Sequence, residues 1–197
     1  MSTADRERWD ARWSERRGEP PAAPSRLVTA LDPLLPRAGR ALDLAGGAGR
    51  HAVWLARRGL AVTLADVSPV ALELARAAAD RAGVALEPLA LDLDEVDAGR
   101  APFPAGPWEL VLCFHCLWRP LPARAASALA PGGLLLWVQP TARNLERHEH
   151  PSARFLLAEG ELARLSAAVP ALEVLRLDEG WSVEGRHEAL LRARRRA

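Results

Sequence analysis

The sequence lacks tyrosine, and its 197 residues hold only three phenylalanines, one methionine and two cysteines. We attribute this skew, together with the abundance of alanine, leucine and arginine, to coding bias rather than to function. No run of ~18 apolar residues is present, which argues against a transmembrane helix. Residues 1–13 lack the apolar core of a secretory signal, so we expect a cytoplasmic protein with no membrane partner. The formal net charge of +1 provides no basic field for a nucleic acid.

The two cysteines, Cys113 and Cys116, form one C-x-x-C pair. Such a pair alone is compatible with a redox site or with half of a zinc site. No second cysteine pair completes a zinc site, although His115, His148 and His150 are candidate ligands. We interpret the cysteines as small apolar side chains near a buried strand end and expect no metal.

Strands and helices alternate along most of the chain. Apolar runs predict strands at 40–45, 60–66, 84–93, 108–114 and 134–140, and the segments between them predict helices at 50–59, 68–83 and 121–133. Residues 3–17 and 25–36 have helical spacing. This alternation is typical of a parallel sheet that is covered on both faces.

The C-terminal part, 172–196, departs from the alternation and predicts two strands around a glycine-containing turn. We therefore expect an α/β, Rossmann-like, seven-stranded and mostly parallel sheet with a C-terminal antiparallel hairpin. The length predicts a single domain, 1–197, in which helical segments in 1–38 precede the core, 39–197. A terminal hairpin is unusual for a dinucleotide-binding domain.

A cluster of small residues follows the first predicted strand: Ala45, Gly46, Gly47 and Gly49. Small side chains let the backbone approach a ligand closely, and the helix that follows directs its N-terminus toward it. Read from Gly47, the stretch satisfies the dinucleotide fingerprint G-x-G-x-x-G/A. Read from Asp43, it is closer to a site for a sulfonium nucleoside. This turn alone leaves both cofactors open.

Carboxylates end the next two strands, where open α/β sheets bind their ligands. Asp66 follows Gly47 by nineteen positions and can accept hydrogen bonds from both ribose hydroxyls. Alternatively, Asp66 is a carboxylate that the dipole of the following helix stabilises at its N-terminus. The glycine turn nearby makes the ribose-binding role the better interpretation. Asp92 could accept from an adenine amine with Leu93 flanking the ring, although for Asp92 taken alone an acidic loop is the better explanation.

Together these features resemble the class I S-adenosylmethionine-dependent methyltransferases over nearly the whole chain. The resemblance includes "LDLAGGAGRHAVWLARRG", "VTLADVSPVALELAR", "ALDLDE", the "APGG" before the fifth strand and the closing hairpin. Within the superfamily, "WDARW", "RFLLAEGEL" and "EGRHEALLRARR" are most similar to the tellurite-resistance-type and related small-molecule methyltransferases.

The resemblance implies S-adenosylmethionine as cofactor, S-adenosylhomocysteine as product and a small-molecule acceptor. It implies that Asp43 and the turn Gly46–Gly49 bind the methionine part of the cofactor, that Asp66 with Val67 binds the ribose, and that Asp92 with Leu93 binds the adenine. Phe114 would lie near the transferred methyl group. Trp9 and Trp13 would belong to an N-terminal helical lid formed by 1–38. The two tryptophans could instead anchor the first helix to the core. The family usually has glycine where this chain has Ala45. We expect alanine there to be tolerated only if its φ is negative and its methyl group misses the ligand.

Methyl transfer from a sulfonium is an in-line displacement that requires alignment of the reactants and a closed pocket. If the acceptor carries a proton, His115 is the best-placed base and His187 the second. An anionic acceptor could be held by Arg119, Arg154 or Arg186. Each of these side chains could instead be a surface arginine or a histidine bonded to the backbone.

Two other functions stay open at this point. A nicotinamide-dependent oxidoreductase is suggested by the match from Gly47 to Ala52, and a non-catalytic S-adenosylmethionine-binding protein by Ala45.

Overall fold

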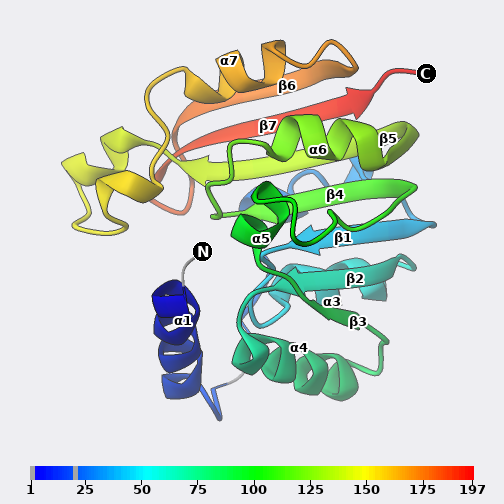
Figure 1. Cartoon of the computed structure of the whole chain (residues 1–197), viewed down its shortest axis with the longest axis vertical. Helices are drawn as coiled ribbons and strands as arrows, with labels where there is room; N and C mark the ends of the chain where they lie inside the picture. The colour runs from blue at the N-terminus through cyan, green and yellow to red at the C-terminus, as the bar shows by residue number, and fades with distance from the viewer. Residues whose placement is uncertain (1–2, 20–21) are drawn as a thin grey trace. The chain divides into compact units, whose positions relative to one another are not determined.

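The computed structural model describes residues 3–19 and 22–197 and consists of two compact units, 1–105 and 106–197 (Figure 1). Its seven strands have the order β3-β2-β1-β4-β5-β7-β6. All neighbouring pairs within the two units are parallel except those of β7, which runs antiparallel to both of its neighbours. The predicted α/β, Rossmann-like sheet with a C-terminal antiparallel hairpin is confirmed.

The first unit holds three parallel strands and the helices that connect them. Its elements are α1 (Thr3–Glu15), α2 (Arg26–Thr29), η1 (Asp32–Leu34), β1 (Arg40–Leu44), α3 (Arg50–Arg57), β2 (Ala61–Asp66), α4 (Pro69–Ala82), β3 (Glu87–Ala90) and α5 (Leu93–Asp97). Leu42 of β1 lies beside Thr63 of β2, and Leu64 is fully buried. Burial on both faces explains why these strands read as continuous apolar runs.

Local sequence signals set the ends of helix α4. The Ser68 hydroxyl accepts from the backbone N–H of Ala71 at 3.1 Å, and Pro69 occupies the first helical position. Gly83 ends the helix with a φ of +67°, a conformation that glycine adopts without steric cost. The helix predicted at 68–83 is therefore confirmed from cap to cap.

The third strand is shorter than predicted. It ends at Ala90 rather than at 93, and a short helix, α5, which the sequence analysis did not predict, begins at Leu93. The physical reason is the Asp92 carboxylate, which accepts from the backbone N–H of Asp94 at 2.9 Å and so caps this helix.

The second unit holds the remaining four strands. Its elements are β4 (Trp108–Phe114), α6 (Leu121–Ala128), β5 (Leu129–Pro140), η2 (Ala142–Glu146), η3 (Ala153–Phe155), α7 (Glu161–Ala167), β6 (Leu172–Trp181) and β7 (His187–Arg195). The hairpin of β6 and β7 confirms the two strands predicted in 172–196.

The "APGG" segment has a different role from the one predicted. Helix α6 ends at Ala128 instead of 133, and the segment belongs to the start of β5. A Cβ atom on Gly133 would lie 2.6 Å from the carbonyl oxygen of Trp108. Glycine is needed here because the strands approach closely, and not because a helix has to stop. Within 3–19 and 22–197, no helix is long and apolar enough to cross a membrane.

Candidate active site

The glycine turn connects β1 to α3, and each of its glycines has a different neighbour. A Cβ atom on Gly49 would lie 2.9 Å from the Cβ atom of Ala75 in α4, so this glycine permits helix packing. A Cβ atom on Gly47, whose φ is +56°, would lie 2.6 Å from Cζ2 of Trp13. The turn is therefore covered by the Trp13 ring, which comes from α1.

Ala45 contradicts the expectation stated for it. Its φ is +55°, in the left-handed region, whereas we expected a negative value. An L-residue with a side chain pays ~1–2 kcal/mol for this conformation because its Cβ atom approaches the following carbonyl oxygen. The chain thus keeps the turn geometry that glycine would allow more easily.

Asp43 lies directly beneath the turn and has no exposed surface. A Cβ atom on Gly46 would lie 2.8 Å from its carboxyl carbon, and neither carboxyl oxygen has a hydrogen-bond partner within the described residues. Burial and, as the second cause, the charge of Asp66 raise the pKa of Asp43 to about 7. The nearby N–H of Ala52 and the charge of Arg50 lower this pKa but do not outweigh them. A buried carboxylate without a donor is costly, so this position suits a donor or cation supplied by a ligand.

Asp66 ties the glycine turn to the start of α4. Its Oδ2 accepts from the N–H of Gly47 at 2.9 Å, and its Oδ1 accepts from the N–H of Ser68 at 2.9 Å. Burial raises its pKa, whereas these backbone donors act in the opposite direction. Each carboxylate oxygen has two lone pairs, so both retain capacity for a further donor such as a ribose hydroxyl. Val67, the next residue, is buried.

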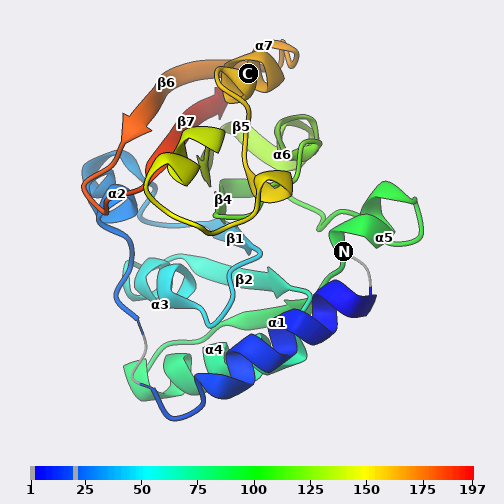
Figure 2. The same cartoon turned by 90° about the vertical axis from the view of Figure 1, so that its left-hand side faces the viewer.

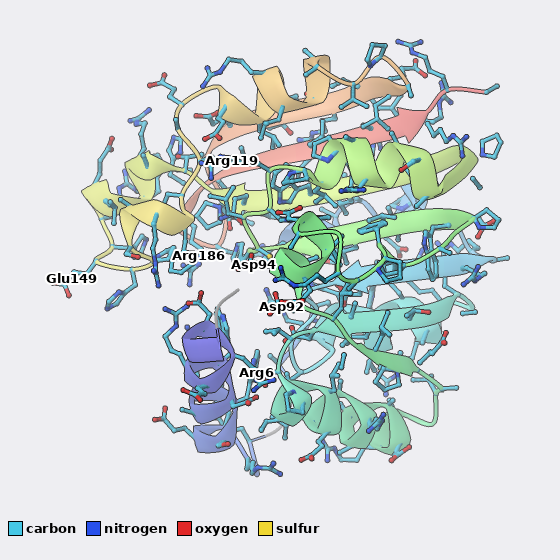
Figure 3. All side chains as sticks on the ribbon, in the orientation of Figure 1. Arg6, Asp92, Asp94, Arg119, Glu149 and Arg186 are labelled. Atoms are coloured by element: carbon cyan, nitrogen blue, oxygen red, sulfur yellow. The ribbon has the colours of Figure 1, made fainter. Side chains whose placement is uncertain are left out.

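The predicted adenine residues follow the neighbouring strand of the same unit. The N–H of Leu91 donates to the carbonyl oxygen of Asp66 at 3.0 Å, which brings the two strand ends together. Asp92 and Asp94 lie at the start of α5 (Figure 3). The Asp92 carboxylate already caps that helix, and Leu93 is buried. The structure therefore shows the helix-capping role of Asp92 directly, and a contact with adenine stays a prediction.

Helix α1 crosses in front of α4 in Figure 2 and is attached to it by polar contacts. The Ser68 hydroxyl donates to the Asp10 carboxylate, and Arg17 pairs with Glu73 at 2.8 Å. The two predicted lid tryptophans differ in their surroundings. Trp13 lies on the glycine turn, whereas the Trp9 ring lies beneath the guanidinium groups of Arg8 and Arg12 of its own helix, at 5.9 and 5.3 Å from its centroid.

In the second unit, His115 directly follows β4 and has an unusual backbone. Its φ is +61°, while its N–H donates to the carbonyl oxygen of Val138 at 2.8 Å. Its ring lies 4.1 Å from that of Phe114, and its Nε2 atom pairs with Oε1 of Glu188. Sequence reasoning missed Glu188. The available signal was an acidic residue between His187 and the apolar residues 189–191 of β7.

His187 is in a different environment from His115. Its Nδ1 atom shares a hydrogen bond of 2.7 Å with the Thr141 hydroxyl, and its N–H donates to the side-chain oxygen of Asn144 at 3.3 Å. The ring is buried and meets that of Trp181 edge-on at 5.3 Å. One ring nitrogen of His187 is therefore engaged with another side chain inside the protein.

The three arginines predicted to hold an anion are engaged to different degrees. Arg119 pairs with Glu161 at 2.6 Å, and Arg154 stacks on Phe155 at 4.5 Å. The hydrogen bond from the Arg119 side chain lowers the pKa of Glu161. Arg186 lies in the turn before β7, and its guanidinium has no hydrogen bond or ion pair within the described part of the chain (Figure 3). Arg186 is therefore the arginine with the most freedom to bind an anion.

The two cysteines are thiols that are not joined in a disulfide, Cys113 buried and Cys116 half-buried. The carbonyl oxygen of Cys116 accepts from the indole N–H of Trp137 at 3.1 Å. Across 3–19 and 22–197 there is no group of three or more His, Cys, Asp or Glu side chains that could hold a metal ion.

Residues 41–133 match the family model described as a methyltransferase domain. Among solved structures, TehB from Haemophilus influenzae has a TM-score of 0.69 at 16% identity, with 96% of this chain and 67% of that chain covered. Magnesium protoporphyrin IX methyltransferase from Synechocystis PCC 6803, solved with bound S-adenosylhomocysteine, has a TM-score of 0.69 at 14% identity, with 98% of both chains covered.

A third structure, from work on the conversion of a disulfide bond into a thioacetal group during echinomycin biosynthesis, has a TM-score of 0.71 at 22% identity. The match covers 97% of this chain and 91% of that chain. No curated protein matches the chain. At these identities the solved structures establish that the fold is shared.

Proposed function

We propose that the chain, whose residues 41–133 match a methyltransferase domain, is a class I S-adenosylmethionine-dependent methyltransferase that methylates a small-molecule acceptor. The observation that carries the proposal is the floor of the glycine turn, where Asp43 is buried without a partner and Asp66 joins the turn to α4. S-adenosylmethionine supplies a methyl group on a sulfonium sulfur and carries an ammonium group and ribose hydroxyls that suit two such carboxylates.

The residues of the first unit would bind and cover this cofactor. Asp43 would receive its cationic end, and Asp66 would accept from the ribose hydroxyls. Trp13 would exclude water from the turn that it covers, and Asp92 would be available to the adenine at the next strand end. Exclusion of water strengthens these electrostatic contacts and protects the reactive methyl group.

The residues of the second unit would serve the acceptor. Phe114 provides an aromatic surface, His115 a base and Arg186 or Arg119 a positive charge. Two of the proteins that share the fold are named for small acceptors: magnesium protoporphyrin IX and, in a putative enzyme from Galdieria sulphuraria, sarcosine and dimethylglycine. A small acceptor also suits a chain whose net charge offers nothing to a nucleic acid.

Calorimetry with S-adenosylmethionine, S-adenosylhomocysteine and NAD, followed by a screen of small acceptors with a radiolabelled methyl donor, tests the proposal. We expect the two sulfur nucleosides to bind, NAD not to bind, and label to enter at least one small acceptor. Binding without transfer to any acceptor would instead favour a non-catalytic binding protein. NAD binding in preference to the sulfur nucleosides would favour the oxidoreductase.

The acceptor-side arginine is tested separately. Replacing Arg119 with alanine removes an exposed ion pair with Glu161, which contributes at most ~1 kcal/mol to stability. If Arg119 holds the acceptor, turnover falls while the affinity for S-adenosylmethionine stays constant. Unchanged turnover would limit Arg119 to its pair with Glu161.

A further inference from the structure

We propose that His115 and Glu188 form a carboxylate–imidazole pair that removes a proton from the acceptor, so that the methylated atom is a neutral O–H or N–H group. The proposal rests on the methyltransferase function above and names the class of acceptor. Glu188 is a positioning residue in this scheme because it acts through His115 and not on the acceptor itself.

The backbone holds His115 in a fixed and costly conformation. The residue is left-handed, which few residues other than glycine adopt, and its N–H is bonded to Val138 of the neighbouring strand β5. The Phe114 ring lies against one side of the imidazole. Such strained residues cluster at functional sites, because the surrounding structure has to maintain them.

Glu188 gives this histidine a defined orientation. It lies opposite Pro140 in the register of β5 and β7, and its side chain is 2% exposed. Its Oε1 atom pairs with Nε2 of His115, and its Oε2 atom has no hydrogen-bond partner in the described part of the chain. A carboxylate buried to this degree needs a donor, and the histidine is the one that the structure provides.

The tautomer of His115 follows from this contact. A carboxylate only accepts hydrogen bonds, so Nε2 has to carry the proton and Nδ1 keeps its lone pair. Within 3–19 and 22–197, Nδ1 has no hydrogen bond, and the His115 side chain is 26% exposed. The free lone pair is therefore on the nitrogen that Glu188 does not occupy, on a side chain that a small molecule can reach.

The proposed step balances as follows. The acceptor's O–H or N–H bond breaks and its proton goes to Nδ1 of His115, while the lone pair on the acceptor atom forms the bond to the methyl carbon. The methyl–sulfur bond breaks, and its electron pair stays on sulfur. His115 then carries a positive charge beside the Glu188 carboxylate and later releases the acceptor's proton to water.

His187, the other candidate base, does not offer this arrangement. Its Nδ1 atom is engaged with Thr141, and its ring is buried. The two histidines thus differ in their access to a small molecule and in the side chain to which each is bonded. Of these two histidines, the comparison assigns proton removal to His115.

The test compares His115→Gly and Glu188→Gln with a matched control, Glu173→Gln. Glu173 is also a paired carboxylate of this sheet, but its partner is Arg194 and both side chains are exposed. The full-length protein is assayed with S-adenosylmethionine and two sets of acceptors: substituted phenols, which carry a proton, and thiols that are already ionised at the assay pH.

We expect His115→Gly to lower kcat for phenols by about 100-fold or more, and Glu188→Gln by about 10-fold or more. The Kd for S-adenosylmethionine should stay within about 2-fold of the parent. Ionised thiols should be much less affected, because they have no proton to lose. Added imidazole should restore part of the His115→Gly activity, and Glu173→Gln should behave as the parent.

Three results would overturn the proposal while leaving the methyltransferase function intact: unchanged kcat for phenols in His115→Gly, equal losses for phenols and ionised thiols, or no response to imidazole. Turnover of ionised thiols with no turnover of any neutral O–H or N–H acceptor would also overturn it. Failure of the parent protein to bind S-adenosylmethionine, or to label any acceptor, would instead refute the function on which the proposal rests.

Discussion

Replacing Gly47 with alanine perturbs the contact between the glycine turn and α1. The new side chain would occupy a left-handed position, which costs ~1–2 kcal/mol. Its Cβ atom would also lie 2.6 Å from Cζ2 and 3.1 Å from Cη2 of Trp13, so the ring has to move. Overpacking of this kind adds ~1–3 kcal/mol, for a total loss of ~2–5 kcal/mol in the free energy of unfolding.

Gly83 provides the matched control for this substitution. Its φ is +67°, and a Cβ atom there would have no neighbour within 4 Å. Gly83→Ala should therefore lose only the ~1–2 kcal/mol of backbone strain. The excess of ~1–3 kcal/mol in Gly47→Ala belongs to Trp13, and it should disappear when both proteins also carry Trp13→Ala.

Urea denaturation of the four variants gives these free energies, and calorimetry gives the affinity for S-adenosylmethionine. In a chain of this size, each 1 kcal/mol corresponds to roughly 2–4 °C in Tm. We expect Gly47→Ala to weaken cofactor binding and Gly83→Ala to leave it unchanged. Equal losses of stability in the two glycine variants, or an excess that persists without the Trp13 ring, would refute the contact between Trp13 and the turn.

Three further predictions concern the same unit. Asp66→Ala should weaken binding of S-adenosylmethionine by at least tenfold in calorimetry, because each charge-assisted hydrogen bond contributes ~1.5–3 kcal/mol; unchanged affinity in a folded variant would remove Asp66 from the site. Ala45→Gly should raise the free energy of unfolding by ~0.5–1 kcal/mol, since relief of the left-handed strain exceeds the entropy that glycine adds to the unfolded chain; a loss of stability would contradict this. The raised pKa of Asp43, about 7 against an ordinary 3.8, means that the folded state binds more protons than the unfolded state between these values, so the free energy of unfolding should fall as the pH rises from about 4 to 7. Asp43→Asn should flatten that dependence in urea titrations, and an identical slope in the variant would show that another group causes it.

Much of the fold was readable from the sequence because its signals are local. Apolar runs separated by helical segments predicted the parallel strands, and Ser68, Pro69 and Gly83 marked the ends of α4. These signals act through hydrogen bonds and backbone angles within a few residues. The errors also have local causes: Asp92 was read only as a strand end and not as a helix cap, and "APGG" was read as a helix stop.

The cofactor class was also predicted, because the glycine turn, Asp66 and the closing hairpin each have a recognisable pattern. The conformation of Ala45 was not. A residue type biases φ without setting it, and here the turn imposes a left-handed angle on a residue that disfavours it.

The sequence by itself determined the order of strands and helices, the glycine turn and the carboxylates at the strand ends, since each depends on neighbours along the chain. Only the tertiary structure decided that Trp13 covers Gly47, that Asp43 is left without a donor and that His115 meets Glu188. His115 and Glu188 are 73 positions apart. A contact of that separation depends on the register between β5 and β7 and on how β4 ends beside them, and no local pattern specifies those two conditions together.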